Sequence, residues 1–240
     1  MAKSILHTAD SRGKADHGWL KSYHTFSFAG YHDPDRVHFG ALRVLNDDRV
    51  DAGQGFGQHP HQNMEIISIP LKGELKHRDN MGNEGIIRPG EIQVMSAGTG
   101  IYHSEFNNSN TEQTAFLQIW VIPNKANVTP RYDQQKIHYR EQINELEQIL
   151  SPDQADKGVW IHQHAWFHIG RFDQHAHTTY NLKDPEHNGV YVFVLDGEVK
   201  IDQQKLQTRD GYGIWDISEF TLEAITEAEV LLMEVPMELD

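Results

Sequence analysis

The sequence contains no cysteine, which excludes disulfides, zinc ribbons and thiol chemistry. It also has no apolar run that approaches the roughly 18–20 residues of a membrane-spanning helix. The first residues, Met1 to Thr8, lack the apolar core of a secretory signal. From these absences we expect a cytoplasmic protein that does not enter membranes.

Positive charge is scarce. Lys and Arg number 21 against 35 Asp and Glu, so the formal net charge is -14. An acidic surface repels nucleic-acid phosphates and anionic lipids, and we therefore expect no direct nucleic-acid binding and no membrane binding. With 38% hydrophobic and 23% charged residues, the 240 residues are typical of a globular protein with one large or two ordinary domains.

The first half of the chain alternates short β-branched runs with glycine turns. Strands are predicted at residues 39–50, 64–71, 74–79, 92–95, 102–106 and 115–123. The first of these runs contains Asn46-Asp47-Asp48, a polar cluster that predicts a turn at its end. Breaks at intervals of about 8–12 residues are typical of an antiparallel sandwich or barrel.

The middle of the chain has a different pattern. Residues 141–150 carry apolar side chains at helical spacing, and Ser151-Pro152 ends the run. We therefore predict a short helical linker over residues 131–158, between an N-terminal domain (1–130) and a C-terminal domain (159–240). The N-terminal arm is expected to pack on the second domain.

The second half of the chain repeats motifs of the first. Leu71-Lys72-Gly73-Glu74-Leu75-Lys76 recurs as Leu195-Asp196-Gly197-Glu198-Val199-Lys200, and Arg88-Pro89-Gly90 recurs as Arg209-Asp210-Gly211. Repeats that occur in the same order indicate two copies of one structural unit. The prediction is therefore an all-β protein built from two antiparallel barrels.

Two pairs of metal-binding side chains bracket residues 59–105. His59 and His61 form one pair, His103 and Glu105 the other, and each pair is spaced i, i+2. In a β-strand this spacing places both side chains on one face. Two such strands facing each other would surround one point with three imidazoles and one carboxylate. That set suits a divalent transition metal and leaves positions open for a substrate or O₂.

The second copy cannot complete the same set. His175-Ala176-His177 echoes the first pair, but no histidine follows where the counterpart of His103 would lie. The repeat offset places the counterparts of His103 and Glu105 near Ala224 and Thr226. We therefore predict one metal per chain, in the N-terminal half. His175 and His177 are interpreted as a relic, with weak metal binding as the alternative.

The spacing of these motifs is similar to that of the cupins, with Gly53, His59, His61 and Glu65 in the first motif and His103 in the second. More specifically, the chain resembles the pirin family, densely over roughly residues 15–135. The likeness is carried by Gly18-Trp19-Leu20, Phe39 to Asp48, Gly55 to His61, His77 to Asn83, Met95 to Gly100, His103 to Glu105, and Thr129 to Tyr132.

The resemblance implies a bicupin, which is a pair of double-stranded β-helix barrels with a degenerate second copy. Pirins hold one metal, usually iron, in the N-terminal barrel, at the positions matching His59, His61, His103 and Glu105. We therefore expect Fe(II), with Mn, Co, Ni, Cu and Zn as alternatives. Bacterial pirins are often described as quercetin 2,3-dioxygenases, whereas a eukaryotic branch acts as a nuclear transcription cofactor with an iron-dependent switch.

Glu65 has two interpretations. Many cupins use the glutamate at this position as a ligand, but pirins use the one that follows the last histidine, so Glu105 is assigned to the metal. Glu65 then either orients a ligand imidazole by accepting its free N–H, or is a buried, hydrogen-bonded strand residue.

The resemblance implies two main functions. The first is a metal-dependent dioxygenase that cleaves a flavonol such as quercetin, or a related catechol, with O₂ and releases carbon monoxide. By analogy, Glu105 would be its general base. The alternative is a non-enzymatic, iron-dependent redox-sensing regulatory protein that binds a protein partner. A weaker third interpretation is a cupin isomerase or hydrolase acting on a small metabolite.

Overall fold

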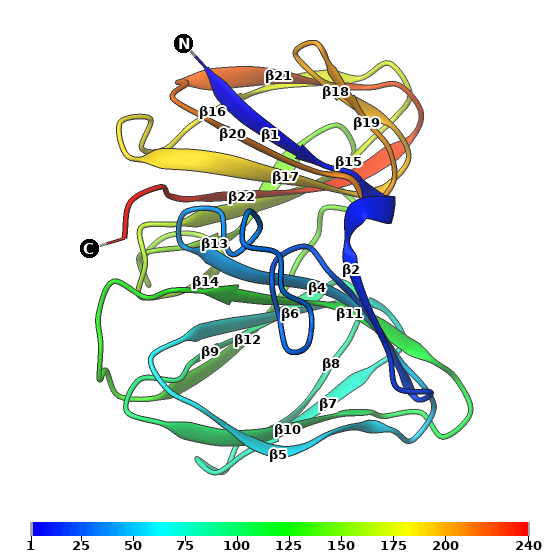
Figure 1. Ribbon diagram of the computed structural model, residues 1–240, viewed down its shortest axis with the longest axis vertical. Coiled ribbons are helices and arrows are strands. Elements are labelled where there is room, and N and C mark those ends of the chain that lie inside the picture. Colours follow the sequence, from blue (N-terminus) through cyan, green and yellow to red (C-terminus); the bar gives the residue numbers. More distant parts are fainter. Residues whose placement is uncertain (1, 240) are drawn as a thin grey trace.

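Two seven-stranded and two four-stranded β-sheets make up the structure, a computed structural model that describes residues 2–239. One sheet of each size belongs to each of two barrels, which Figure 1 shows stacked one above the other. The prediction of an all-β protein with two barrels is confirmed. Among the described residues, no helix has the length and apolar composition needed to cross a membrane.

The N-terminal barrel carries the predicted metal residues. In spatial order, its large sheet consists of β12 (Arg131–Lys136), β9 (Glu91–Ser96), β6 (Glu65–Lys72), β11 (Thr114–Val121), β4 (Leu42–Val50), β3 (Leu20–His24) and β2 (Gly13–Asp16). Its small sheet consists of β5 (Gly55–His61), β10 (Ile101–Asn107), β7 (Leu75–Asp79) and β8 (Glu84–Ile87).

The C-terminal barrel also takes in the first strand of the chain. Its large sheet consists of β1 (Lys3–His7), β20 (Gly211–Trp215), β17 (Asn188–Asp196), β22 (Ala228–Pro236), β15 (Trp166–Phe172), β13 (Leu146–Ser151) and β14 (Val159–Trp160). Its small sheet consists of β16 (His177–Asn181), β21 (Glu219–Ala224), β18 (Val199–Ile201) and β19 (Gln204–Leu206). The short 3-10 helix η1 (Ala9–Ser11) then leads the chain down to β2 of the other barrel (Figure 1).

The two large sheets pack their outer faces against each other. Side chains alternate along β6, so Ile67 joins the apolar core between the barrels, whereas Ile66 and Ser68 face the interior of the N-terminal barrel. Phe167 and Leu231 of the C-terminal barrel enter the same shared core. The small sheet with β5 and β10 therefore lies on the side of the N-terminal barrel that faces away from its neighbour (Figure 1).

The internal repeat is visible in the register of the strands. In the N-terminal barrel, β11 pairs with β6 so that Phe116 faces Pro70, next to a bulge. In the C-terminal barrel, β22 pairs with β17 so that Val230 faces Val194, next to a bulge at the same place. Because bulges are specific features of a strand pair, this agreement gives each residue of one barrel an identifiable counterpart in the other.

The helix predicted within residues 131–158 is wrong. Residues 131–136 form β12 of the N-terminal barrel, and residues 146–151 form β13 of the C-terminal barrel. Ile149 and Leu150 are both buried in the core between the barrels, because β13 pairs with β15 and packs against the facing sheet. Apolar spacing alone does not distinguish a helix from a short strand that is buried on both faces.

The turn predicted at Asn46-Asp47-Asp48 is also wrong. These residues are buried in the middle of β4, which pairs with β3 on one side and β11 on the other. Asp47 faces the second barrel, where its carboxylate lies 3.4 Å from guanidinium nitrogens of Arg12 and of Arg209. Long-range charge partners therefore allow a polar cluster that would otherwise favour a turn to continue as a strand.

Candidate metal centre

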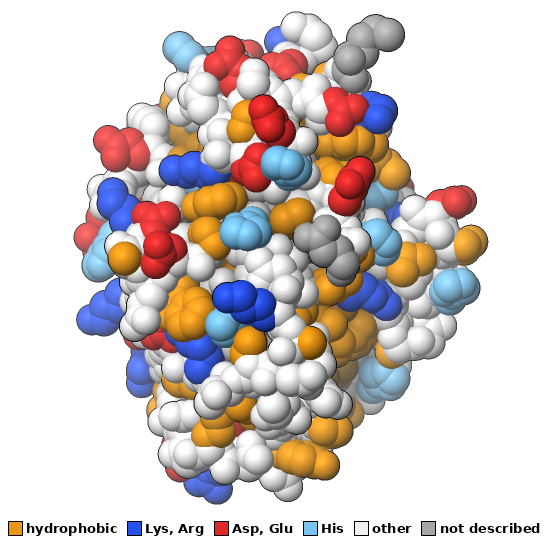
Figure 2. Space-filling view, turned by 90° about the vertical axis from the view of Figure 1, so that its left-hand side faces the viewer, with side chains coloured by type: hydrophobic (Ala, Val, Ile, Leu, Met, Phe, Trp, Pro, Cys, Tyr) orange, Lys and Arg blue, Asp and Glu red, His pale blue; other side chains and the backbone are white. Residues whose placement is uncertain are grey.

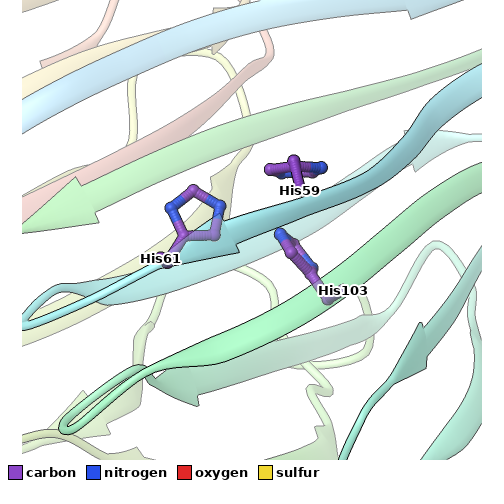
Figure 3. A group of neighbouring side chains, drawn as sticks. All are labelled: His59, His61 and His103. Carbon is purple, nitrogen blue, oxygen red and sulfur yellow. The ribbon is translucent and has the colours of Figure 1, made fainter.

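The three predicted histidines meet on neighbouring strands of the small sheet. His59 and His61 project from β5, and His103 of β10 pairs directly with His59. The ring centroids of His59 and His103 are 4.3 Å apart, and the other two ring pairs are each 4.9 Å apart. Figure 3 shows the rings turned toward one space, in which one ligand atom from each ring lies within 4.8 Å of the others.

The imidazoles of His61 and His103 fit a metal, because burial holds both rings neutral. Burial, together with the charges of the neighbouring histidines, lowers the pKa of His103 to about 2, and burial with His59 lowers that of His61 to about 4. Metal ligation requires the unprotonated ring. The buried His103 ring has no hydrogen-bond partner on either nitrogen within residues 2–239, as expected for a side chain kept for a metal.

His59 also has a defined orientation. Its Nδ1 lies 2.8 Å from the carbonyl oxygen of Gly57, an acceptor that requires the proton to be on Nδ1. The lone pair is therefore on Nε2, free for a ligand bond, which is the usual arrangement of metal-binding histidines.

Glu105 is buried beside this cluster and bridges the two sheets of the barrel. Its carboxylate accepts hydrogen bonds from Ser68 Oγ at 3.0 Å and from Gln118 Nε2 at 2.7 Å. Burial raises the pKa of Glu105. The close group of ligand atoms contains the three histidines without Glu105, so its role as fourth ligand stays a prediction. Each oxygen has only one of these bonds and keeps a lone pair that could reach a metal.

Glu65 does not contact the ligand histidines. It lies three residues before Ser68 on β6, and alternation along the strand therefore turns it to the opposite face. Its carboxylate accepts a hydrogen bond from Ser96 Oγ at 2.7 Å, and burial raises its pKa to about 7. The predicted role in orienting a ligand imidazole is therefore wrong, and the buried, hydrogen-bonded alternative describes Glu65.

The second barrel replaces the metal residues with apolar ones. Since Leu75 and Val199 are equivalent in the repeat, their partners Asn107 and Ala224 are equivalent as well. Counting back along each strand makes Leu222 the counterpart of Glu105 and Phe220 that of His103. The counterparts predicted near Ala224 and Thr226 are therefore wrong, because the connecting loops differ in length.

The same register identifies the other replacements. Tyr180 faces Phe220 as His59 faces His103, so His175 and His177 do not occupy the places of His59 and His61. Val192 and Leu232 face each other where the first barrel pairs Ser68 with Gln118. These replacements are Tyr180, Val192, Phe220, Leu222 and Leu232, and all of them belong to one buried cluster inside the second barrel.

A cavity of about 220 Å³ adjoins the first-barrel cluster. Aromatic side chains form part of its wall: Trp120 packs edge-on against the His61 ring at 4.9 Å and against Phe28 at 5.4 Å. Polar residues of β3 and β4, including His24, Asn46 and Asp48, form another part. A larger cavity of about 660 Å³ lies elsewhere and contains none of the clustered histidines.

Sequence reasoning missed the residues that surround the ligands. Gln118 and Ser68 were detectable as lone polar residues in otherwise apolar strands, but nothing local connects either of them to Glu105. The buried His77 is another: its Nε2 lies 3.1 Å from Asp79 Oδ2, and its ring centroid is 5.6 Å from that of His103. Each of these contacts depends on strand pairing.

Comparison with known proteins agrees with this geometry. Residues 6–121 match the family model described as Pirin, and residues 148–235 match the quercetinase C-terminal cupin domain. The chain is 42% identical over 238 residues to a protein of Escherichia coli K12 named quercetin 2,3-dioxygenase, covering 96% of this chain and 98% of that protein. The chain belongs to the pirin family.

Solved structures of pirins and related proteins extend the comparison. The bacterial pirin YhhW from Escherichia coli, in complex with nickel(II), superposes with a TM-score of 0.92 at 41% identity and covers 98% of this chain and 100% of its own. A quercetin 2,3-dioxygenase from Acinetobacter baumannii, at 22% identity and a TM-score of 0.77 over 99% of this chain and 88% of its own, shares the fold. The three clustered imidazoles of this pirin form a candidate site for a divalent metal.

Proposed function

We propose that the chain is a metal-dependent dioxygenase that cleaves a flavonol such as quercetin with O₂ and releases carbon monoxide. The observation that carries this proposal is the cluster of three imidazoles beside a buried carboxylate, next to a cavity with aromatic walls. The similarity of the chain to proteins named quercetin 2,3-dioxygenase supports the choice of substrate. The proposal includes a cytoplasmic location.

His59, His61 and His103 would hold the metal, with Glu105 as the fourth ligand. A divalent transition metal bound there, Fe(II) by family likeness, would bind the 3-hydroxyl oxygen of the flavonol and lower the pKa of that hydroxyl. The protein side chains would then have two tasks, which are to accept the hydroxyl proton and to position the aromatic rings.

Glu105 is suited to take the hydroxyl proton. Because burial raises its pKa, its carboxylate binds a proton more tightly than an exposed glutamate does. Ser68 and Gln118 each donate a hydrogen bond to a different oxygen of the carboxylate, so its orientation is fixed before a substrate arrives. A base held in this way need not reorganise when the proton is transferred.

The aromatic walls would position the substrate and limit access of water. Trp120 and Phe28 present an edge-to-face pair beside His61, a surface suited to the flat rings of a flavonol. The cavity of about 220 Å³ is small relative to the roughly 300–1,000 Å³ of typical ligand pockets, so part of the flavonol would extend toward solvent.

The experiment is a turnover assay under controlled oxygen. Metal-free protein is loaded with Fe(II) anaerobically and mixed with quercetin and then with O₂, while flavonol absorbance and carbon monoxide are followed. Loss of absorbance with matching carbon monoxide release is expected. The control is the variant His59→Ala, prepared without metal, and turnover no faster than this control would refute the proposal.

The alternative of an iron-dependent regulatory protein stays a prediction. The acidic net charge of -14 suits a protein partner better than DNA. Figure 2 shows acidic side chains gathered over the upper half of the face that it presents. Partner binding that differs between the Fe(II) and Fe(III) forms would favour this function, and identical binding by both forms and by the metal-free protein would argue against it.

A further inference from the structure

A row of polar side chains crosses the interior of the N-terminal barrel. On neighbouring strands of its large sheet, His24 faces Asn46, Asn46 faces Gln118, Gln118 faces Ser68, and Ser68 faces Gln93. All five residues are buried. Buried polar side chains on one continuous line require partners, and the partners they have or lack indicate what the row does.

Only the centre of this row is explained by the metal site. Gln118 and Ser68 hold Glu105. Toward β3 and β4, in contrast, His24 Nδ1 and Asn46 Oδ1 have no hydrogen-bond partner within residues 2–239. Asp48, two residues after Asn46 and on the same face of β4, likewise has an unpartnered Oδ1. A buried polar atom without a partner is destabilising, so three of them beside one cavity indicate a ligand that supplies the missing bonds.

These three residues line the cavity that also contains His59 and His61. The fold itself does not require a polar residue at the place of Asp48. In the second barrel, Gly170 faces Val230 where Asp48 faces Phe116, so a residue without a side chain takes the place of Asp48. The counterparts of Asn46 and His24 are also polar, His168 and Gln148, but both have hydrogen-bond partners: the Tyr180 hydroxyl lies 3.3 Å from His168 Nδ1, and Gln148 donates to the carbonyl oxygen of Lys157. A polar wall with unpartnered atoms is therefore a feature of the first barrel, and it lies beside the metal cluster.

We propose that Asn46, Asp48 and His24 form a hydrogen-bonding wall that binds the hydroxyl groups a flavonol carries beyond its 3-hydroxyl, and so select polyhydroxylated over unsubstituted flavonols. This inference rests on the proposed function and assigns the substrate specificity to residues outside the ligand set. A site built to bond a hydroxyl discriminates against an analogue that lacks it, because its buried polar groups then stay unpaired.

The test compares two ligands that share the metal-binding group. Quercetin carries hydroxyls on both ring systems, whereas 3-hydroxyflavone has only the one beside its carbonyl. Dissociation constants are measured anaerobically with nickel-loaded protein, by quenching of tryptophan fluorescence. Wild-type protein should bind quercetin at least about tenfold more tightly than 3-hydroxyflavone, the discrimination expected from one good hydrogen bond.

The variants Asn46→Leu and Asp48→Ala, which remove the polar atoms, should each reduce this ratio several-fold, to about one when combined, with little change for 3-hydroxyflavone. The matched control is Gln93→Leu, since Gln93 belongs to the same row and its buried amide is also unpartnered among the described residues, but it does not line the cavity. Its ratio should equal that of the wild type. Because the readout is a ratio measured on one preparation, partial misfolding affects both ligands and leaves it unchanged.

The outcomes separate this inference from the proposed function. An unchanged ratio in both cavity variants, with both flavonols still bound, would overturn the hydrogen-bonding wall and leave the dioxygenase proposal standing. The cavity would then satisfy these residues with water. If neither flavonol binds wild-type protein and quercetin is not turned over, the proposed function fails and this inference fails with it.

Discussion

Replacing Gln118 with leucine should weaken metal binding without removing any ligand. The Gln118 amide donates a 2.7 Å hydrogen bond to one oxygen of Glu105 from a strand of the opposite sheet. Leucine is already present at the equivalent position, Leu232, of the second barrel, so the fold accommodates it there. The substitution therefore removes one orienting contact and introduces a side chain of similar size.

Two independent estimates give the expected size of the effect. Loss of a group that orients a metal ligand typically lowers affinity about 10–100-fold, which is about 1.4–2.8 kcal/mol. A hydrogen bond to a charged group contributes about 1.5–3 kcal/mol, which is the same range. We therefore expect the dissociation constant for Ni²⁺ to rise about 10–100-fold in Gln118→Leu.

Isothermal titration of metal-free protein with Ni²⁺ and a competing chelator measures this change. Gln93→Leu is the matched control, because it makes the same substitution two strands away in the same buried row. Glu105→Gln should weaken binding more than Gln118→Leu does. If Glu105→Gln binds Ni²⁺ as tightly as wild type, Glu105 is not a ligand. If only Gln118→Leu is unaffected, its positioning role is refuted.

Three further predictions concern stability. Wild-type protein should be stabilised by about 2.7 kcal/mol at Ni²⁺ one hundred times above its dissociation constant, and His103→Ala should lose this thermal shift in scanning fluorimetry; an equal shift in both would contradict the metal assignment. Burial raises the pKa of Glu65 from 4.5 to about 7. The stability that protonated Glu65 contributes is therefore fully present below pH 4.5 and is lost as the pH rises through 7. Between pH 4.5 and pH 8, the free energy of unfolding of Glu65→Gln, measured with urea, should therefore fall by about 2–3 kcal/mol less than that of wild type. Equal pH slopes for the two proteins would argue against this. Asp47→Ala leaves the buried Arg12 and the half-buried Arg209 without their carboxylate and should lower the free energy of unfolding by about 3–5 kcal/mol, whereas a loss below about 1 kcal/mol would show that the cluster contributes little.

The two barrels show what the metal site adds to a shared scaffold. Both have the same strand pairing, and both contain the same bulge between equivalent strands. In the second barrel Phe220 and Leu222 fill the space with a packed apolar cluster. The first barrel instead keeps buried polar side chains and a cavity in this space. Polar burial of this kind destabilises the barrel unless a ligand or metal compensates for it.

The sequence by itself determined the features that depend on short-range periodicity. Alternating apolar runs between glycine turns identified the strands, and repeated motifs identified the two barrels. The spacing of His59 with His61, and of His103 with Glu105, placed each pair on one face of a strand because side chains alternate with a period of two. The absence of a second His103 was equally visible, since it depends only on residue identity.

Only the tertiary structure decided the features that depend on which strands pair and in which register. Residues 146–151 became a strand because β15 offered them a partner. Glu65 turned away from the metal because its position relative to Ser68 on β6 sets its face. Gln118 reached Glu105 because β11 lies opposite β10 in the folded barrel. Each outcome arises from contacts between segments distant in sequence, and no local pattern encodes them.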